Sequence, residues 1–187
     1  MLVVEKKINH PKLQAISGII PEKNTLLIGN TRAGKSATLQ TWWKQMHETM
    51  VDNPIHFTDG DGNIMHTELR NYPLSNKGIY ISESELVTIL ESLDRDIPAQ
   101  FFDKLKFKKY ILLDEAFRKD NWNINVGTMG TWRLKGLVDF WEFIDSHRDI
   151  IVFATTNNNP AEIVKIGGDM LIARVGEAFP KESWVVV

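Results

Sequence analysis

A glycine-rich octapeptide in this chain ends in a lysine and a serine, side chains suited to binding phosphate and a divalent metal. Residues 29–36 read Gly-Asn-Thr-Arg-Ala-Gly-Lys-Ser and fit the pattern G-x-x-x-x-G-K-[ST] at every required position. Glycines let successive backbone N–H groups turn toward phosphate oxygens, and the start of a helix adds the positive end of its dipole. The spacing therefore predicts a phosphate-binding loop.

The residues of this loop have different expected roles. Lys35 is expected to reach the β- and γ-phosphates of a nucleoside triphosphate, and the Ser36 hydroxyl is expected to ligate Mg²⁺. A chance glycine turn is the alternative interpretation. The mostly apolar residues 25–28 predict a buried strand before the loop, and residues 36–50, without glycine or proline, predict a helix after it; both favour the phosphate-binding loop. The other members of the predicted binding set are Gly29, Asn30, Thr31, Arg32, Ala33, Gly34 and Ala37.

Two carboxylates follow a second apolar segment, 110–113. Asp114 at the end of this predicted strand is expected to hold Mg²⁺ through the outer coordination shell, completing what Ser36 begins. Glu115 is placed to orient and deprotonate an attacking water. The alternative is an exposed acidic strand end without a role, which the glycine loop upstream disfavours.

The rest of the chain must supply the elements that bring these segments together. The chain has 187 residues, 43% of them hydrophobic and 25% charged, which predicts one α/β domain over residues 1–187. Its expected architecture is three layers, α/β/α, around a mainly parallel central sheet. Beyond the strands at 25–28 and 110–115, we predict strands at 1–7, 54–57, 78–81, 150–157, 170–174 and 184–187.

Helices are predicted where apolar residues recur at helical spacing. Ser82 and Glu85 form a capping-box pattern before one such run, which Ile97-Pro98 is expected to end. A second helix is predicted at 134–146. Residues 116–132 are polar and predict a long loop. Larger side chains in the loop and directly after it are expected to contact either a translocating strand or another subunit; these are Arg118, Lys119, Trp122 and Arg133.

Two other segments carry charged side chains at suggestive spacing. Asp59, Asp61 and Asn63 match the first ligands of a calcium loop, but Ile64 and Arg70 stand where that loop needs glycine and glutamate, so a polar turn is predicted. The segment 101–109 interleaves lysines with aromatic residues. It is interpreted either as a nucleic-acid contact or, as we favour, as a solvated rim around a buried aromatic face.

Composition excludes several classes of function. The net charge of −2 gives no global basic field for nucleic acid, and the lack of cysteine excludes disulfides and thiolate metal sites. No signal peptide, membrane span or repeat is visible in the sequence. We expect a cytoplasmic protein, in the host cytoplasm or associated with the virion if it is viral.

With the glycine loop, the Leu-Leu-Asp-Glu strand and a strand ending in Thr155-Thr156-Asn157 in this order, the chain resembles additional-strand P-loop ATPases. The resemblance implies a P-loop NTPase fold that binds ATP and Mg²⁺. It also implies that a polar side chain after the third strand lies beside the γ-phosphate and positions the water. Asn157 is the first choice for this role and Thr156 the second, with a strand-end turn before Pro160 as the alternative.

Within this group, the chain is similar to the FtsK–HerA motors with viral genome-packaging ATPases, and to AAA+ helicase loaders without a helical lid. The resemblance implies a homo-oligomeric ring acting on DNA, with a capsid or helicase protein as a further partner. Arg148 and Arg174 are the candidates for an arginine donated to the neighbouring subunit's phosphate. The alternatives to a packaging motor are a helicase loader, a superfamily 3-like helicase and, less favoured because of Glu115, a small-molecule kinase.

Overall fold

The computed structural model describes residues 7–122 and 127–187. Its centre is a five-stranded sheet in which every neighbouring pair is parallel, in the order β4-β5-β6-β1-β7. The strands are β1 (Thr25–Ile28), β4 (Gly78–Ser82), β5 (Tyr110–Asp114), β6 (Ile151–Thr156) and β7 (Trp184–Val186). Because all five strands run the same way, their carboxyl ends lie along one edge of the sheet.

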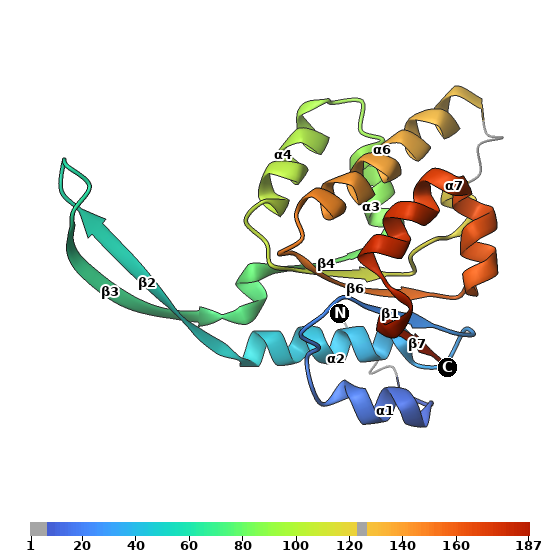
Figure 1. The fold of residues 1–187 in the computed structure, drawn as a ribbon, viewed down its shortest axis with the longest axis horizontal. Helices are drawn as coiled ribbons and strands as arrows, with labels where there is room; N and C mark the ends of the chain where they lie inside the picture. The colour runs from blue at the N-terminus through green and yellow to red at the C-terminus, as the bar shows by residue number, and fades with distance from the viewer. Residues whose placement is uncertain (1–6, 123–126) are drawn as a thin grey trace.

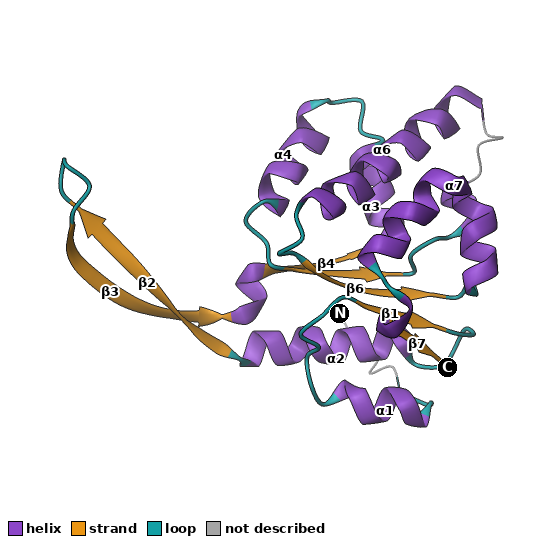
Figure 2. Cartoon of the chain, viewed as in Figure 1, coloured by secondary structure: helices purple, strands orange, loops and turns teal. Residues whose placement is uncertain are grey.

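Helices cover both faces of this sheet and give the predicted three-layer α/β/α architecture (Figures 1 and 2). One face carries α1 (Pro11–Ser17) and α2 (Lys35–Glu48). The other carries α3 (Glu83–Leu90), α4 (Asp96–Leu105), α6 (Gly127–Ser146) and α7 (Pro160–Ala178). Short helices lie at α5 (Lys119–Trp122), η1 (Leu74–Lys77) and η2 (Lys181–Ser183).

Alternating side chains of the strands divide the core between the two faces. Leu27, Leu112 and Phe153 pack with buried residues of α1 and α2. Their neighbours along the strands point to the other face, where a larger cluster includes Trp141 and Phe179. Strands buried on both faces read as continuous apolar runs, which is why the sequence predicts all three central strands.

A two-stranded antiparallel hairpin projects from the body of the molecule (Figure 1). Its strands are β2 (Met50–Thr58) and β3 (Ile64–Pro73). At its tip the Asp59 carboxylate accepts hydrogen bonds from the backbone N–H groups of Asp61 and Asn63, at 3.0 and 2.9 Å. The predicted polar turn is confirmed, and the strand predicted at 54–57 belongs to this hairpin, outside the central sheet.

Several predicted elements differ from the structure. Residues 170–174 lie in α7, not in a strand, because the capping box of Asn159 and Glu162 starts a helix that continues through them. A short apolar run does not distinguish a strand from a buried helix. Pro98 does not end a helix; it lies in the first turn of α4, where a backbone N–H has no helical partner in any case.

Other differences concern loops and the N-terminal segment. The predicted long loop 116–132 contains α5 and the beginning of α6, and α1 has no counterpart among the predictions. Residues 1–6 of the predicted N-terminal strand lie outside the described part of the chain. The strands predicted at 78–81 and 184–187 and the capping box of Ser82 and Glu85 are confirmed. Over the described ranges, no helix has both the length and the apolar character required to span a membrane.

Candidate active site

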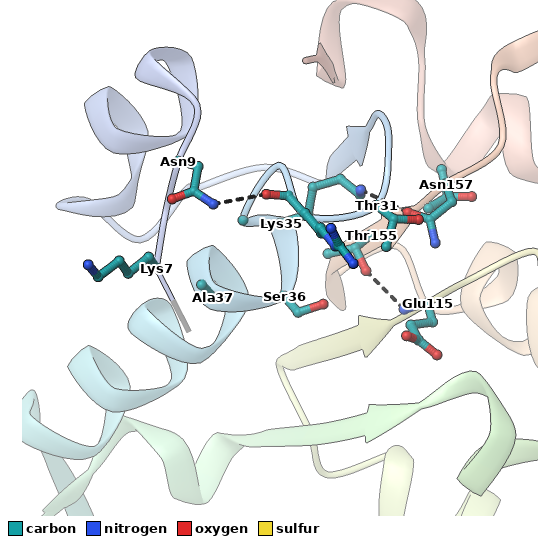
Figure 3. A pocket seen from close by; sticks show the side chains of 12 residues that line it. Lys7, Asn9, Thr31, Lys35, Ser36, Ala37, Glu115, Thr155 and Asn157 are labelled. Carbon is teal, nitrogen blue, oxygen red and sulfur yellow. Dashed lines mark hydrogen bonds between the residues drawn. The ribbon is translucent and has the colours of Figure 1, made fainter. Parts of the chain in front are cut away.

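A cavity of about 400 Å³ lies at the carboxyl edge of the sheet, beside the loop that joins β1 to α2. It brings together residues from the glycine loop, the end of β5, the end of β6 and the segment before α1 (Figure 3). The residues that line it are Lys7, Asn9, Thr31, Arg32, Gly34, Lys35, Ser36, Ala37, Glu115, Thr155, Thr156 and Asn157.

The two glycines of the loop allow two close backbone approaches. Gly34 caps α2 with a φ of 99°, a left-handed conformation, and a Cβ there would lie 2.7 Å from the Cα of Ile8. A Cβ on Gly29 would lie 2.3 Å from the carbonyl oxygen of Val187. Asn9 also donates a hydrogen bond to the Arg32 carbonyl oxygen at 3.1 Å (Figure 3). The loop is therefore held between the segment before α1 and the residues after β7.

Lys35 is 6% exposed and extends along the inside of the loop. Its ammonium group donates to the carbonyl oxygens of Gly29 and Asn30, both at 2.8 Å, and to Asn157 Oδ1 at 2.9 Å. Burial lowers the pKa of Lys35, and the negative charges of Asp114 and Glu115 oppose that shift. The lysine thus places a positive charge between the glycine loop and the end of β6.

Asp114 ends β5 and is 7% exposed. Its Oδ1 accepts hydrogen bonds from Ser36 Oγ at 2.8 Å and from Thr155 Oγ1 at 2.6 Å. The Glu115 backbone N–H donates to the same oxygen at 3.1 Å, and the Tyr80 hydroxyl donates to Oδ2 at 3.1 Å. Burial, with the nearby charge of Asp114, raises the pKa of Tyr80, so the phenol stays a donor. The structure thus joins the two predicted metal ligands, Ser36 and Asp114, directly.

The donor set at this position fits magnesium. One carboxylate and one hydroxyl side by side match the way Mg²⁺ is bound through few protein oxygens together with substrate phosphates. In the described residues no group of three or more His, Asp or Glu side chains forms a metal cage. Ser36 and Asp114 could hold Mg²⁺ beside a phosphate.

Glu115 lies at the rim of the cavity and is about half exposed. Its φ of 58° turns the chain immediately after β5, and its backbone N–H is fixed by Thr155 Oγ1 at 2.9 Å. Its carboxylate pairs with Arg118 Nη1 at 3.0 Å. A turn of this kind aims the carboxylate away from the sheet and toward solvent at the cavity mouth.

The structure distinguishes the two candidates at the end of β6. Asn157 is exposed, lines the cavity and contacts Lys35. Thr156 is 1% exposed, and its hydroxyl accepts a hydrogen bond from the Asn158 backbone N–H at 3.1 Å. Asn157 is therefore the side chain in position to meet a ligand held by Lys35.

Of the two predicted arginines, Arg148 is not among the described residues that line this cavity. Arg148 lies before the amino end of β6, and its side chain is 84% exposed. Its Nη2 atom is 3.9 Å from Asp145 Oδ1. Because β6 has six residues, Arg148 is about 20 Å from the edge that carries Asn157. Arg174 is in α7 and its side chain lies outside the described part of the structure. Of the loop residues predicted to meet a strand or a subunit, Trp122 is instead buried.

A buried glutamate that the sequence analysis missed holds the loop after Glu115. Glu83 is 0% exposed and accepts hydrogen bonds from the backbone N–H groups of Phe117 and Arg118, at 2.5 and 3.0 Å. It also accepts from Asn121 Nδ2 at 2.9 Å and Trp122 Nε1 at 3.3 Å. Burial raises the pKa of Glu83, and these four hydrogen bonds oppose the shift.

Little in the sequence could have identified Glu83 or Tyr80. Glu83 opens a helix with a capping box, where an acidic residue is ordinarily a solvated partner of the helix dipole. Tyr80 lies within an apolar strand. Both act on residues more than thirty positions away in the chain, so their roles depend on β4 lying beside β5.

No protein-family model matches this chain, and no curated protein matches it significantly.

Proposed function

We propose that this protein is a Mg²⁺-dependent ATP hydrolase whose turnover drives movement along DNA. The observation that carries the proposal is the convergence of two hydrogen-bonded pairs at one edge of the sheet. Lys35 Nζ donates to Asn157 Oδ1 at 2.9 Å, and Ser36 Oγ donates to Asp114 Oδ1 at 2.8 Å. Glu115 stands at the mouth of the same cavity. A lysine, a metal-binding pair and a carboxylate open to water are the parts that phosphoryl transfer to water requires.

Each group of residues in the site has a separate role in this hydrolysis. The backbone of the glycine loop and Lys35 hold the phosphates and offset the charge that develops on them. Ser36 and Asp114 hold Mg²⁺, which neutralises phosphate charge when bound. Glu115 accepts the proton of the attacking water, and Asn157 positions that water or the γ-phosphate.

The strand order supports membership of the additional-strand group. In this chain β6 lies between β1, which carries the glycine loop, and β5, which carries Asp114. A strand inserted between these two is the feature after which the group is named. Thr155 and Asn157 reach the site because β6 occupies this place.

We further propose that the working form is a homo-oligomeric ring, as in a viral-type genome-packaging motor. The cavity is open at the protein surface, since Arg32, Glu115 and Asn157 are all exposed. Arg148 is too distant from its own cavity to contact a phosphate there, so any catalytic contribution from it must be made to a neighbouring subunit.

Phosphate release from ATP tests the proposal directly. Glu115→Gln is expected to retain nucleotide affinity and to lower the turnover rate by about 100- to 10,000-fold, the usual range for loss of a general base. Lys35→Ala is expected to lose affinity as well. Glu22→Gln, at an exposed position in the turn before β1, is the matched control and is expected to turn over like the wild type. Wild-type turnover in Glu115→Gln contradicts the assignment.

The class of the ATPase is tested by what stimulates it. Stimulation by DNA alone supports a motor or a helicase, whereas stimulation only with a partner helicase supports a loader. Transfer of the γ-phosphate to a nucleoside, in place of release as inorganic phosphate, identifies a kinase and overturns the proposal.

A further inference from the structure

A second groove lies at the opposite edge of the sheet from the glycine loop. It has a volume of about 890 Å³ and is formed where the root of the hairpin meets the residues leading into β5. Lys109 donates its backbone N–H to the Lys77 carbonyl oxygen at 2.7 Å, which joins the starts of β4 and β5 at this place. Its lining includes Lys77, Lys106, Phe107, Lys108, Lys109 and Tyr72.

The groove concentrates positive charge in a protein with a net charge of −2. Four lysines line it against one carboxylate, that of Asp149. Within the described residues, Lys106 alone of the four is ion-paired, to Asp103 at 2.8 Å. Lys108 donates to a backbone carbonyl oxygen at 2.8 Å. A cluster of like charges is unfavourable by itself, and a bound polyanion offsets that repulsion.

The remaining two lysines lie against aromatic rings. Lys77 Nζ is 5.5 Å from the centroid of Tyr72, and Lys109 Nζ is 5.6 Å from the centroid of Tyr110. Neither ammonium group has a carboxylate partner among the described residues. The two ring contacts hold the charges in place beside aromatic surface, an arrangement suited to a ligand that has both phosphates and planar rings.

Phe107 lies within this lysine run and is 83% exposed. The preceding helix already supplies its core contacts through Phe101 and Leu105, which are 7% and 0% exposed. The aromatic face that the sequence predicted to be buried is therefore buried only in part, and Phe107 contributes little to the core. A large apolar ring between two lysines offers a face on which a base can stack.

We propose that this groove binds a single-stranded segment of nucleic acid, with phosphates on the lysines and a base on Phe107. The inference rests on the proposed function for the class of ligand and adds its site. The same short strand, β5, starts at the groove and ends at Asp114. Nucleic acid bound at one edge of the sheet is therefore one strand length from the metal-binding pair at the other.

Binding of a fluorescein-labelled oligothymidine, measured by fluorescence anisotropy between about 50 and 200 mM salt, tests the proposal. The double variant Lys106→Gln/Lys108→Gln is expected to weaken binding. It is also expected to reduce the magnitude of the slope of log K against log salt by about 1.4, because each of two lost phosphate contacts accounts for about 0.7. Phe107→Ala is expected to weaken binding about tenfold and to leave the slope unchanged. Lys23→Gln/Lys181→Gln removes two exposed lysines outside the groove and is expected to bind like the wild type.

The outcomes separate this site from other interpretations. Equal affinities in the wild type and both groove variants overturn the proposal. Competition by polyglutamate, an acidic peptide, is the second test. If polyglutamate competes as well as the oligonucleotide and its binding is unaffected by Phe107→Ala, the proposal is overturned, because the groove then serves an acidic protein partner. Thermal unfolding of each variant distinguishes lost binding from lost folding.

Phosphate release without nucleic acid is measured in parallel. Normal turnover combined with no groove-dependent oligonucleotide binding overturns this inference alone. Absent turnover combined with groove-dependent binding overturns the proposed ATPase and leaves the nucleic-acid site.

Discussion

Glu83 is expected to be the residue on which the loop after Glu115 depends most. In Glu83→Ala the four donors that converge on the carboxylate lose their acceptor. The backbone N–H of Arg118 and the amide of Asn121 are partly buried and can turn to water. The backbone N–H of Phe117 and the indole N–H of Trp122 are buried and cannot.

The expected cost follows from the two buried donors. Each buried donor left without a partner costs about 1–3 kcal/mol, so the free energy of unfolding is expected to fall by about 2–6 kcal/mol. For a chain of this size each kcal/mol lowers Tm by about 2–4 °C, so a fall on the order of 10 °C is expected. ATP turnover is expected to fall as well, because the turn that aims Glu115 loses its support.

Thermal unfolding followed by tryptophan fluorescence measures the stability, and hydrogen exchange at the Phe117 and Arg118 amides measures the local effect. Glu85→Ala is the matched control, since it removes the same side chain from the same helix. Glu85 is an exposed capping-box partner of Ser82, and its loss is expected to cost only about 0.5–1 kcal/mol. If Glu83→Ala is as stable as Glu85→Ala and its loop amides exchange at the wild-type rate, the reasoning about the clamp is wrong.

Three further predictions concern the loop, the metal pair and pH. Gly34→Ala is expected to lose nucleotide affinity and stability, because Gly34 has a left-handed φ and a Cβ there would lie 2.7 Å from neighbouring backbone. Gly18→Ala is the control, since a Cβ at Gly18 would have nothing within 4 Å. Equal melting temperatures of the two variants contradict the argument. Tyr80→Phe removes the donor to Asp114 Oδ2 and is expected to change the Mg²⁺ concentration needed for half-maximal phosphate release; an unchanged magnesium titration shows that the tyrosine has no part in holding the carboxylate. Burial raises the folded-state pKa of Glu83 above its ordinary value of 4.5, so the folded protein binds more protons and stability is lost as pH rises from 4.5 through that pKa. Urea unfolding across this range measures the free energy of unfolding of the wild type and of Glu83→Ala. The advantage of the wild type is expected to shrink as pH rises, and an advantage that grows with pH contradicts the raised pKa of Glu83.

The sequence was sufficient for features that depend on neighbours along the chain. The octapeptide 29–36, the apolar runs of the central strands and the capping box of Ser82 and Glu85 are all local patterns. Local patterns also placed Lys35 and Ser36 at the start of a helix and Asp114 at the end of a strand, as the structure has them. The three-layer architecture was implied by the resemblance, and the apolar runs agree with it because strands buried on both faces are continuously apolar.

Where local patterns were ambiguous, the predictions were wrong. The run 170–174 has the apolar character of a short strand, but the cap at Asn159 starts a helix that makes it part of α7. The hairpin was predicted only in part, because residues 64–73 are largely exposed and carry no buried face that would mark a strand.

The chain by itself determined which groups are present to do chemistry: a lysine and a serine after a glycine loop, a pair of carboxylates after a strand, and an asparagine after another. Only the tertiary structure decided the direct contacts that these groups make. The order of the strands puts Thr155 and Tyr80 on Asp114, brings Asn157 to Lys35, and turns Glu83 inward onto a loop more than thirty residues away. Such contacts depend on how the strands are arranged in space, and no spacing along the chain encodes that arrangement.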